Sequence, residues 1–587
     1  MDWLNLILSF LAGFGLFLFG MEYMGEGLNK AAGDKMKNIL GALTKNRLLG
    51  ILVGAGVTAL IQSSSATTVM VVGFVNVGLL NLRQAVGVIM GANIGTTITS
   101  WIVALGEWTA FLKPSVLAPI FIVTGVFLIM FVKNLYVQSI GQILFGFGGL
   151  FLGLDMMSGA AEPLSELERV RSLFLLLGSN PFLGIVTGAI VTAVIQSSSA
   201  SVGILQALCL TGMVPYASAL PIIMGQNIGT CITAILSSIG TCKNARRAAL
   251  IHLYFNLIGT TIFMIVFYLL NAVIDFNLLE ESASPAGVAT IHSIFNISAT
   301  IMLLPFAGLL EKLAYFTIKE DESERRINCR DEEFQLLDER FLETPSFAVE
   351  QCRQLVNKMG EISKEALFKS IEILQEYNEE KAETVKKIEE RVDHYEDELG
   401  NYLVRLSSKN LSEKDSHLVS MFLHLIGDYE RISDHAVNIM EAGKEIKEKR
   451  LNFSEEAKEE MLVFAKAVKD IVNIALQVIE DQDKKLASTV EPLEEVIDHL
   501  KDKLKGRHIQ RLREGKCTIE LGFVFSDIIT NYERVSDHCS NIALYMLQLN
   551  NEESFDAHEY MEQYKREDNE EFKEKYLSYK MQYKLPS

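Results

Sequence analysis

A short polar cluster occurs twice in the chain, each time inside a long apolar stretch. Gln62-Ser63-Ser64-Ser65-Ala66 returns 134 positions later as Gln196-Ser197-Ser198-Ser199-Ala200. Serine is a preferred N-cap residue, so a helix that begins within each triplet would direct its free N–H groups and its positive dipole end at the cluster. Two such helix ends can bind a phosphate-like or carboxylate anion without a cationic side chain.

The correspondence continues beyond the clusters. Gly91-Ala92-Asn93-Ile94-Gly95-Thr96 matches Gly225-Gln226-Asn227-Ile228-Gly229-Thr230 at the same offset, which indicates a duplicated unit. An anion bound at the clusters calls for a cation to enter with it. Hard oxygen ligands for that cation are offered by Gln62, Gln196, Asn93, Asn227, Thr96 and Thr230. The alternative is that the small residues simply let helices pack closely.

The apolar segments that flank each cluster are too short to cross a membrane. Half-spans of about 12 to 15 residues cannot traverse a hydrocarbon core that needs about 20. We therefore expect two re-entrant hairpins whose polar tips meet near the middle of the bilayer. Broken backbone at that depth requires burial in protein or a cavity, and paired interrupted segments indicate a transporter's binding site.

Seven further segments are long enough for full crossings, at residues 4–23, 85–105, 114–132, 138–157, 217–239, 248–272 and 288–310. The sequence thus predicts two repeats, at about residues 3–135 and 136–316. Three full crossings in the first repeat is an odd number, so the second repeat should be inverted relative to the first.

The distribution of basic residues predicts the orientation. With the C-terminal half in the cytoplasm, the cytoplasmic loops hold Lys30, Lys35, Lys37, Lys45, Arg47, Arg83, Lys133, Lys243, Arg246, Arg247 and Lys312, and the outer loops hold Lys113, Arg169 and Arg171. This excess follows the positive-inside bias. We expect a multi-pass protein of the cytoplasmic membrane with its N-terminus outside.

The doubled Gln-Ser-Ser-Ser, each copy followed by Gly-x-Asn-Ile-Gly-Thr, resembles the type II sodium–phosphate cotransporter family over about residues 1 to 315. The resemblance implies sodium-coupled transport of inorganic phosphate. It implies a phosphate site formed by Gln62, Ser63, Ser64, Ser65, Gln196, Ser197, Ser198, Ser199, Asn93 and Asn227. By position it adds Thr67, Thr68 and Ser201 to the sodium ligand candidates Gln62, Gln196, Thr96 and Thr230.

Two histidines lie within the predicted spans, each four residues before an asparagine. His252 precedes Asn256, and His292 precedes Asn296, so each pair shares a helix face. An ionisable residue in a span suggests function. The alternative, which we favour, is that these pairs hydrogen-bond neighbouring helices.

The rest of the chain has a different composition. Residues 1–316 hold 14 Lys and Arg and 13 Asp and Glu, whereas the remainder holds 40 and 60. We expect a transmembrane domain at 1–316, a connector at 317–345, a soluble helical domain of two three-helix bundles at 346–550 and a tail at 551–587. The fold class is all-α throughout. The acidic balance argues against nucleic acid as a partner.

The soluble half is also duplicated. Asp428-Tyr429-Glu430-Arg431-Ile432-Ser433-Asp434-His435 returns as Asn531-Tyr532-Glu533-Arg534-Val535-Ser536-Asp537-His538, 103 positions later. Glu-x3-Asp-His occurs four times, and its carboxylates share a helix face. Such oxygen-rich clusters suit Mg, Mn or Fe ions, although a lone Glu-x3-Asp is common on solvated helices. The candidate ligands are Glu389, Asp393, Glu430, Asp434, Glu494, Asp498, Glu533 and Asp537.

Residues 340 to 550 resemble the PhoU family of phosphate-signalling regulators, which implies metal clusters at these acidic motifs. We expect phosphate, sodium and the bilayer as partners, with signalling proteins or a second copy of the chain as further partners of the tail. No nucleophile elbow, P-loop or zinc-protease motif is found, which argues against an enzyme. Three alternatives stay open: a carrier of another small anion, a phosphate exporter and a phosphate sensor that does not transport.

Overall fold

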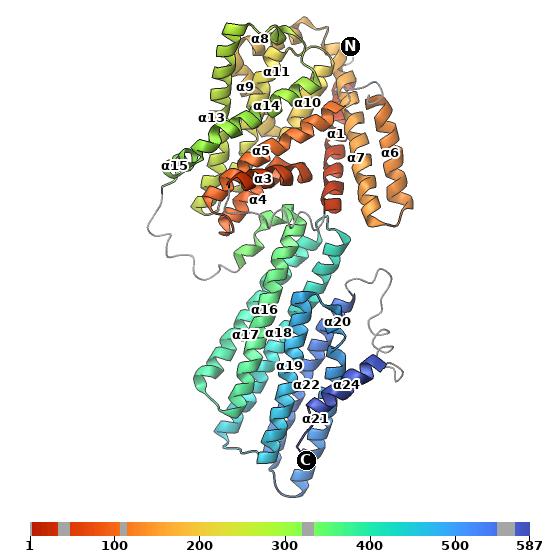
Figure 1. Cartoon of the computed structure of the whole chain (residues 1–587), viewed down its shortest axis with the longest axis vertical. Helices are drawn as coiled ribbons and strands as arrows, with labels where there is room; N and C mark the ends of the chain where they lie inside the picture. Colours follow the sequence, from red (N-terminus) through yellow and green to blue (C-terminus); the bar gives the residue numbers. More distant parts are fainter. Residues whose placement is uncertain (1–2, 33–46, 106–113, 320–333, 549–569, 587) are drawn as a thin grey trace. The chain divides into compact units, whose positions relative to one another are not determined.

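The computed structural model describes residues 3–32, 47–105, 114–319, 334–548 and 570–586, and within these ranges the regular elements are all helices (Figure 1). The all-α class is confirmed. The chain divides into two compact units, Met1–Phe347 and Ala348–Ser587. Some residues on which predictions rest lie outside the described ranges: Lys35, Lys37, Lys45, Lys113, part of the connector (320–333) and part of the tail (551–569).

Six described stretches are long and apolar enough to cross a membrane. They are formed by α1 (Trp3–Ala32), α5 (Leu82–Ala104), α7 (Leu135–Ala161), α11 (Tyr216–Gly229) with α12 (Cys231–Ser237), α13 (Lys243–Ile274), and α14 (Pro285–Leu303) with α15 (Ala307–Thr317). Seven full spans were expected; the one at 114–132 corresponds to α6 (Pro114–Phe131), which is apolar but is not among these six stretches. The chain is therefore a multi-pass membrane protein.

Both predicted hairpins are present as broken helix pairs. α3 (Arg47–Ile61) is followed by α4 (Ser64–Asn76), and α9 (Pro181–Ile195) by α10 (Ser198–Leu210). Ser63 Oγ accepts a hydrogen bond from the Ala66 N–H, and Ser197 Oγ accepts one from the Ala200 N–H, so the serines cap the second helix of each pair as expected. The inversion of one repeat relative to the other stays a prediction.

A left-handed residue breaks each helix. Gln62 and Gln196 both have φ of 59°. For a residue with a Cβ this backbone conformation is uncommon, and it occurs here at the matched position of both copies. The reversal of the chain thus takes place at the glutamine, and the serine that follows begins the next helix.

Glycines bring the first helix of each hairpin against the following span. A Cβ added to Gly91 of α5 would lie 2.0 Å from the Ile51 carbonyl oxygen of α3, and one added to Gly225 of α11 would lie 2.0 Å from the Ile185 oxygen of α9. Backbone therefore meets backbone in both repeats. Small residues do allow close packing here, but at the glycines rather than at the serine clusters.

An amphipathic helix that the sequence reading did not anticipate precedes the second hairpin. α8 (Glu168–Ser179) meets α9 at a bend of 109° at Asn180. The side chain of Asn180 caps α9 by accepting a hydrogen bond from Leu183 N–H.

The end of the connector packs on the first hairpin. Phe74 of α4 lies 5.4 Å from Phe341 and 4.7 Å from Phe347 between ring centroids. Asn76 Nδ2 donates to Asp338 Oδ2 at 3.1 Å. Residues 338–347 therefore form part of the first unit.

The second unit consists of long antiparallel helices and one C-terminal helix (Figure 1). They are α16 (Pro345–Gln375), α17 (Glu379–Ser407), α18 (Glu413–Glu448), α19 (Glu455–Asp481), α20 (Lys484–Ala487), α21 (Val490–Arg513), α22 (Ile519–Gln548) and α24 (Glu570–Gln582). α18 packs against α17 and α22, and α22 packs against α19 and α21. The duplicated helices α18 and α22 thus join the two halves of this unit.

Candidate functional site

The two hairpin tips meet at matched serines. Ser64 Oγ lies 3.4 Å from Ser198 Oγ, within hydrogen-bond reach, although the residues are 134 positions apart. Both side chains are buried. Thr233 of α12 donates to Ser65 Oγ at 3.3 Å and links the first tip to the second repeat. The two serine clusters therefore meet at their middle serines, Ser64 and Ser198.

The two glutamines of the tips differ in environment. Gln62 is buried, and its Oε1 accepts a hydrogen bond from Thr99 Oγ1 at 3.0 Å. Gln196 is exposed, and its matched threonine, Thr233, bonds to the other tip instead. Ser199 is buried and Ser197 is half-buried. Gln196 is thus the more accessible glutamine, whereas Ser65 of the first tip is half-buried and more accessible than the matched Ser199.

Asn93 and Asn227, which follow the two hairpins, are each held by a buried histidine. His252 Nε2 of α13 lies 3.3 Å from Asn93 Oδ1, and His292 Nε2 of α14 lies 3.3 Å from Asn227 Oδ1. Asn93 Nδ2 donates to Asn256 Oδ1 at 3.2 Å. The favoured interpretation of the His–Asn pairs, bonding between neighbouring helices, agrees with these contacts.

A second bond fixes the ring of His292 but is not matched in His252. His292 Nδ1 lies 3.0 Å from Ser100 Oγ of α5. His252 Nδ1 is buried and has no hydrogen-bond partner among the described residues. The sequence placed both histidines in spans, but it contained no signal that pairs His252 with Asn93 of the first repeat and His292 with Asn227 of the second.

The candidate sodium ligands lie on, or at the ends of, the hairpin helices and the spans that follow them. Thr58 Oγ1 donates to Thr67 Oγ1 at 3.0 Å, and the matched Thr192 Oγ1 donates to Ser201 Oγ at 2.8 Å. The other hydroxyls donate to backbone carbonyls of their own helices and keep their lone pairs for a ligand: Thr68 to Ser65, Thr96 to Ala92 and Thr230 to Gln226.

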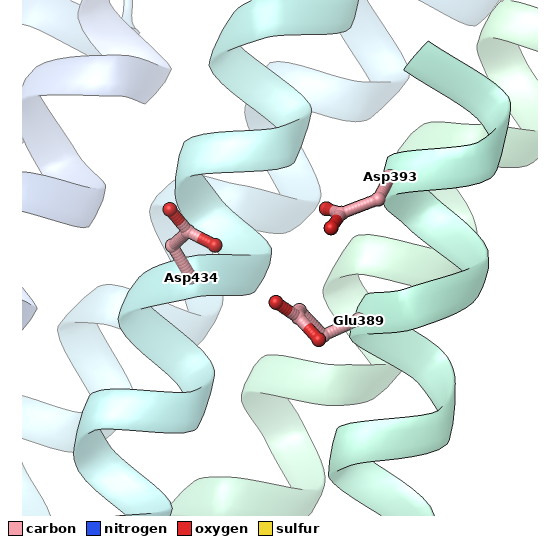
Figure 2. Close-up of side chains that lie close together, drawn as sticks. All are labelled: Glu389, Asp393 and Asp434. Atoms are coloured by element: carbon pink, nitrogen blue, oxygen red, sulfur yellow. The ribbon is translucent and has the colours of Figure 1, made fainter. Parts of the chain in front are cut away.

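In the second unit, three of the predicted carboxylates come together. Glu389 and Asp393 on α17 and Asp434 on α18 point toward one another, and one oxygen of each lies within 4.8 Å of the others (Figure 2). Burial, with the charges of the neighbouring carboxylates, raises the pKa of both Glu389 and Asp393. Burial and Asp434 raise the pKa of Glu430 to about 7. Mutual repulsion of this kind is relieved by a bound cation.

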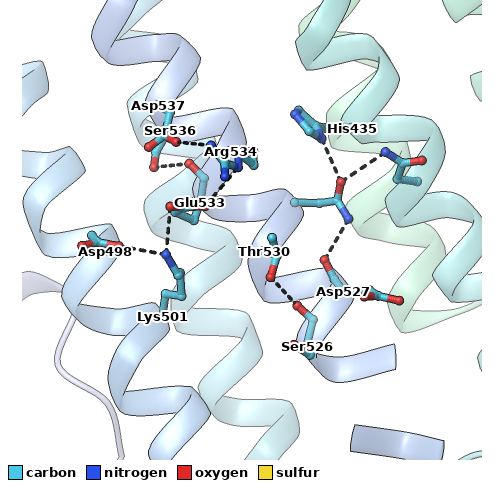
Figure 3. A network of polar contacts seen from close by, with 12 residues as sticks. His435, Asp498, Lys501, Ser526, Asp527, Thr530, Glu533, Arg534, Ser536 and Asp537 are labelled. Atoms are coloured by element: carbon cyan, nitrogen blue, oxygen red, sulfur yellow. Dashed lines mark hydrogen bonds and ion pairs between the residues drawn. The ribbon is translucent and has the colours of Figure 1, made fainter. Parts of the chain in front are cut away.

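In the second copy of the acidic motif, a lysine side chain of the protein supplies the positive charge. Lys501 Nζ lies 3.1 Å from Asp498 Oδ1 and 2.8 Å from Glu533 Oε1, and Arg534 lies 3.4 Å from Asp537 (Figure 3). Burial alone would lower the pKa of Lys501, but its hydrogen bonds to Glu533 and Asp498 raise it. Lys501 occupies the position that Glu396 has in the first copy. The two copies, predicted to be equivalent, therefore differ.

The histidines of the motif bond across the α18–α22 interface. His538 Nδ1 lies 2.7 Å from Asp428 Oδ1, and His435 Nδ1 lies 2.8 Å from Asn531 Oδ1. Burial lowers the pKa of His435. These rings join the two copies.

Comparison with known families matches both halves of the chain. The family described as Na+/Pi-cotransporter matches residues 16–159 and 164–282. The PhoU domain matches residues 356–443 and 462–546. The serine clusters lie in the first family and the acidic motifs in the second.

Individual proteins resemble the chain at modest sequence identity. The protein named "Putative inorganic phosphate export protein YjbB" from Salmonella typhimurium is 25% identical over 551 residues, which cover 92% of this chain and 97% of that protein. Bacillus subtilis YqeW is 29% identical over 315 residues, 53% of this chain and 98% of its own. The sheep sodium-dependent phosphate transport protein 2A is 42% identical over 104 residues, 17% of this chain and 16% of its own. The chain thus carries a membrane domain of the Na+/Pi-cotransporter family followed by a PhoU domain.

Proposed function

We propose that the chain moves inorganic phosphate across the cytoplasmic membrane together with sodium, with phosphate bound between the two hairpin tips. The contact between Ser64 and Ser198 carries this proposal, because it brings two helix N-termini to one point. The hydroxyls of the six serines and the amides of Gln62, Gln196, Asn93 and Asn227 would then surround the anion. The helix dipoles supply positive potential where side-chain cations are lacking.

Sodium is the counter-charge that fits this site. Phosphate carries more negative charge than two helix ends can balance, so a cation that enters with it lowers the cost of removing both from water. Hydroxyl and amide oxygens of Thr67, Thr68, Ser201, Thr96, Thr230, Gln62 and Gln196 are the hard ligands available. The family description supports sodium as the co-substrate.

For orientation, we propose an outer N-terminus and a cytoplasmic PhoU domain, on the strength of the basic-residue distribution. Domain boundaries near residues 316 and 346 follow from the change in composition. The direction of phosphate transport depends on the ion gradients, because sodium coupling allows either uptake or efflux. The name of the Salmonella relative favours export as the second candidate.

Phosphate flux in proteoliposomes tests the proposal. Labelled phosphate is measured in both directions, with sodium gradients imposed inward, outward or not at all. We expect sodium-dependent flux in the wild type and at least a tenfold loss in the Ser63→Ala, Ser197→Ala double variant, because each change removes an N-cap worth about 1 kcal/mol at a tip.

Ser298→Ala is the matched control, because the Ser298 hydroxyl donates only to carbonyls of its own helix. Sulfate and small carboxylates are included as competitors, and stronger inhibition by either than by phosphate would assign another anion. Phosphate binding without flux under any gradient would contradict transport and favour a sensor.

We further propose that the first acidic cluster of the PhoU domain binds one divalent cation. Glu389, Asp393 and Asp434 would hold it, with Glu430 beside them. Oxygen ligands suit Mg²⁺ or Mn²⁺. Titration of the chelator-treated full chain with Mn²⁺, read by electron paramagnetic resonance, should show one site that Asp434→Asn removes and Asp537→Asn leaves. Equal loss in both variants would contradict this assignment.

A further inference from the structure

The C-terminal end of the chain folds back on α21 and encloses a cavity of about 380 Å³ within the second unit. α24 packs against α21, as Figure 1 shows. Two bonds fasten the residues beyond α24: Tyr583 Oη donates to Asp470 Oδ2 at 2.6 Å, and Arg507 Nη1 donates to the Pro586 carbonyl oxygen at 2.7 Å. Tyr583 is 2% exposed, so this end is built into the fold.

The cavity wall is basic in an acidic domain. Its ionisable side chains, apart from two tyrosines, are His499, Lys503, Arg507, Lys580 and Lys584, and no carboxylate belongs to the described lining. The part of the chain beyond residue 316 holds 60 Asp and Glu against 40 Lys and Arg. The basic lining of this cavity therefore differs from the acidic composition of the domain that contains it.

The lysines of this wall are available to a ligand. Arg507 is engaged by Glu460, with Nη1 at 2.8 Å from Oε1. Lys503 and Lys584, in contrast, are exposed and form no ion pair within the described ranges. Lys580 lies over the Tyr576 ring, with Nζ at 5.1 Å from the centroid. Three ammonium groups therefore surround one opening without a fixed anionic partner.

The remaining wall is aromatic and aliphatic. Tyr576 lies edge-on to His499, with centroids 5.9 Å apart. The rest of this lining is Val496, Leu500, Met581, Tyr583 and Leu585. A phosphate ion alone would leave this apolar surface uncovered. The volume falls in the range of about 300 to 1,000 Å³ that is usual for small-molecule sites.

We propose that this cavity binds a nucleotide, with its phosphates at Lys503, Lys580 and Lys584 and its base against Tyr576 and His499. Ammonium groups bind phosphates as point charges, and tyrosine faces accept planar rings. The site is separate from the acidic clusters and does not depend on the direction of transport. Occupancy would report the cell's phosphorylated metabolites to a domain attached to a phosphate transporter.

Calorimetric titration of the full chain in detergent tests the proposal. ATP, pyrophosphate and inorganic phosphate are titrated in EDTA, which keeps divalent ions out of the acidic cluster. We expect ATP to bind and the Lys503→Ala, Lys584→Ala double variant to weaken its affinity at least tenfold. Lys505→Ala, an exposed lysine of the same helix outside the cavity wall, should leave the affinity unchanged.

Position is tested by photolabelling with azido-ATP and mass spectrometry. Label should appear in peptides covering residues 496–507 and 570–586 and be displaced by ATP. Absence of ATP binding, an affinity unaffected by the double variant, or label elsewhere would overturn the site. Equal affinity for pyrophosphate and ATP would overturn the role of the base, and displacement of the azido-ATP label by inorganic phosphate as readily as by ATP would overturn the nucleotide class.

Discussion

Lys501 shows how one substitution between duplicated segments changes the chemistry of a site. In the first copy the equivalent residue is Glu396, so carboxylates face carboxylates. In the second copy the ammonium of Lys501 lies between Asp498 and Glu533. A single charge reversal thus gives the second copy a counter-charge from the protein itself, where the first copy has one more carboxylate.

Replacing Lys501 by an uncharged residue should leave the carboxylates of the second cluster to repel one another. For Lys501→Met we expect a loss of about 1 to 2 kcal/mol in unfolding free energy in EDTA, since Glu533 is only 13% exposed and keeps only the more distant Arg534, at 3.8 Å, as a counter-charge. Millimolar Mn²⁺ should restore most of the lost unfolding free energy. Thermal unfolding with and without Mn²⁺ measures both effects, and Lys505→Met is the control. Equal stability of Lys501→Met and wild type in EDTA would show that the bridge is unimportant.

If Asn93 and Asn227 bind phosphate as proposed, the histidines bonded to them would act as positioning residues. His252→Ala leaves the Asn93 amide with one bond fewer in a buried site, which costs about 1 to 3 kcal/mol. We expect the KM for phosphate to rise about tenfold or more with a smaller change in kcat, and His252→Gln to recover part of the affinity.

Thr261→Ala on the same helix is the control, because the Thr261 hydroxyl is exposed and donates to its own helix. Loss of folded protein in His252→Ala with no change in KM would assign the histidine a purely structural role.

Which residues form the tip could be predicted from the sequence, because the duplicated Gln-Ser-Ser-Ser carries its own capping chemistry. The partners of Asn93 and Asn227 could not, since hydrogen bonds between distant helices leave no spacing pattern. The left-handed conformation of Gln62 and Gln196 was also hidden, because glutamine has no preference for it.

At the scale of the element, each hairpin depends on the contact of its first helix with the following span. Gly91→Ala would place a methyl group 2.0 Å from a backbone oxygen that cannot move independently of α3. We expect a destabilisation of at least about 1 to 3 kcal/mol and loss of phosphate flux.

Gly56→Ala on α3 itself is the control, because a Cβ there meets nothing within 4 Å. Thermal unfolding in detergent and phosphate flux in proteoliposomes are measured for both the Gly91→Ala and Gly56→Ala variants. Similar behaviour of the two variants would show that the close approach of α3 and α5 is not required.

The facing helices α17 and α18 should respond to pH when no cation is bound. The folded pKa of Glu430, about 7, lies above the ordinary value of 4.5, so the folded chain binds more protons than the unfolded chain between these values. The unfolding free energy should therefore fall as pH rises through this window, by about 1 kcal/mol because solvent screens a partly exposed group.

Unfolding midpoints in EDTA at pH 5.5 and pH 8 measure this slope. Glu430→Gln should flatten it, whereas Glu441→Gln, an exposed position on the same helix, should not. A slope that survives Glu430→Gln would assign it to other carboxylates.

The helical character of the second unit was predicted from the sequence, and its described elements are helices. α8 was missed because its 12 residues are too few for a full span and include Arg169 and Arg171, which were assigned to an outer loop. α24 lies in a tail with no clear periodicity, and it is defined by packing against α21.

At the scale of the whole molecule, the transport function should reside in the first unit. Bacillus subtilis YqeW matches within 315 residues over 98% of its own length, so a chain of the membrane part alone exists. We expect a chain that ends after Phe347 to fold and to transport phosphate. One that ends after Phe316 should be less stable, because it loses the contacts of Phe341 and Phe347 with Phe74.

Flux and thermal unfolding of both truncations, beside the full chain, measure the effect. Equal stability of the two truncations would show that residues 317–347 contribute nothing to the first unit. Loss of flux in both would show that the PhoU domain is required for transport.

Composition alone predicted the division into an apolar and an acidic half, and the repeated motifs predicted the family resemblance. Composition marked residues 317–345 as a connector but gave no indication of what its end contacts, because its aromatic residues are separated by charged ones. Only the structure shows that residues 338–347 pack on α4.

The duplicated segments touch each other in a reciprocal manner. Asp428 contacts His538 while Asn531 contacts His435, and each pair is the other shifted by 103 positions. Ser64 contacts its own copy, Ser198. Contacts in which i meets j and j meets i are the signature of an isologous dimer. Each half of the chain thus retains the interface of two identical ancestors, and gene fusion is the simplest history that would leave both imprints in one polypeptide.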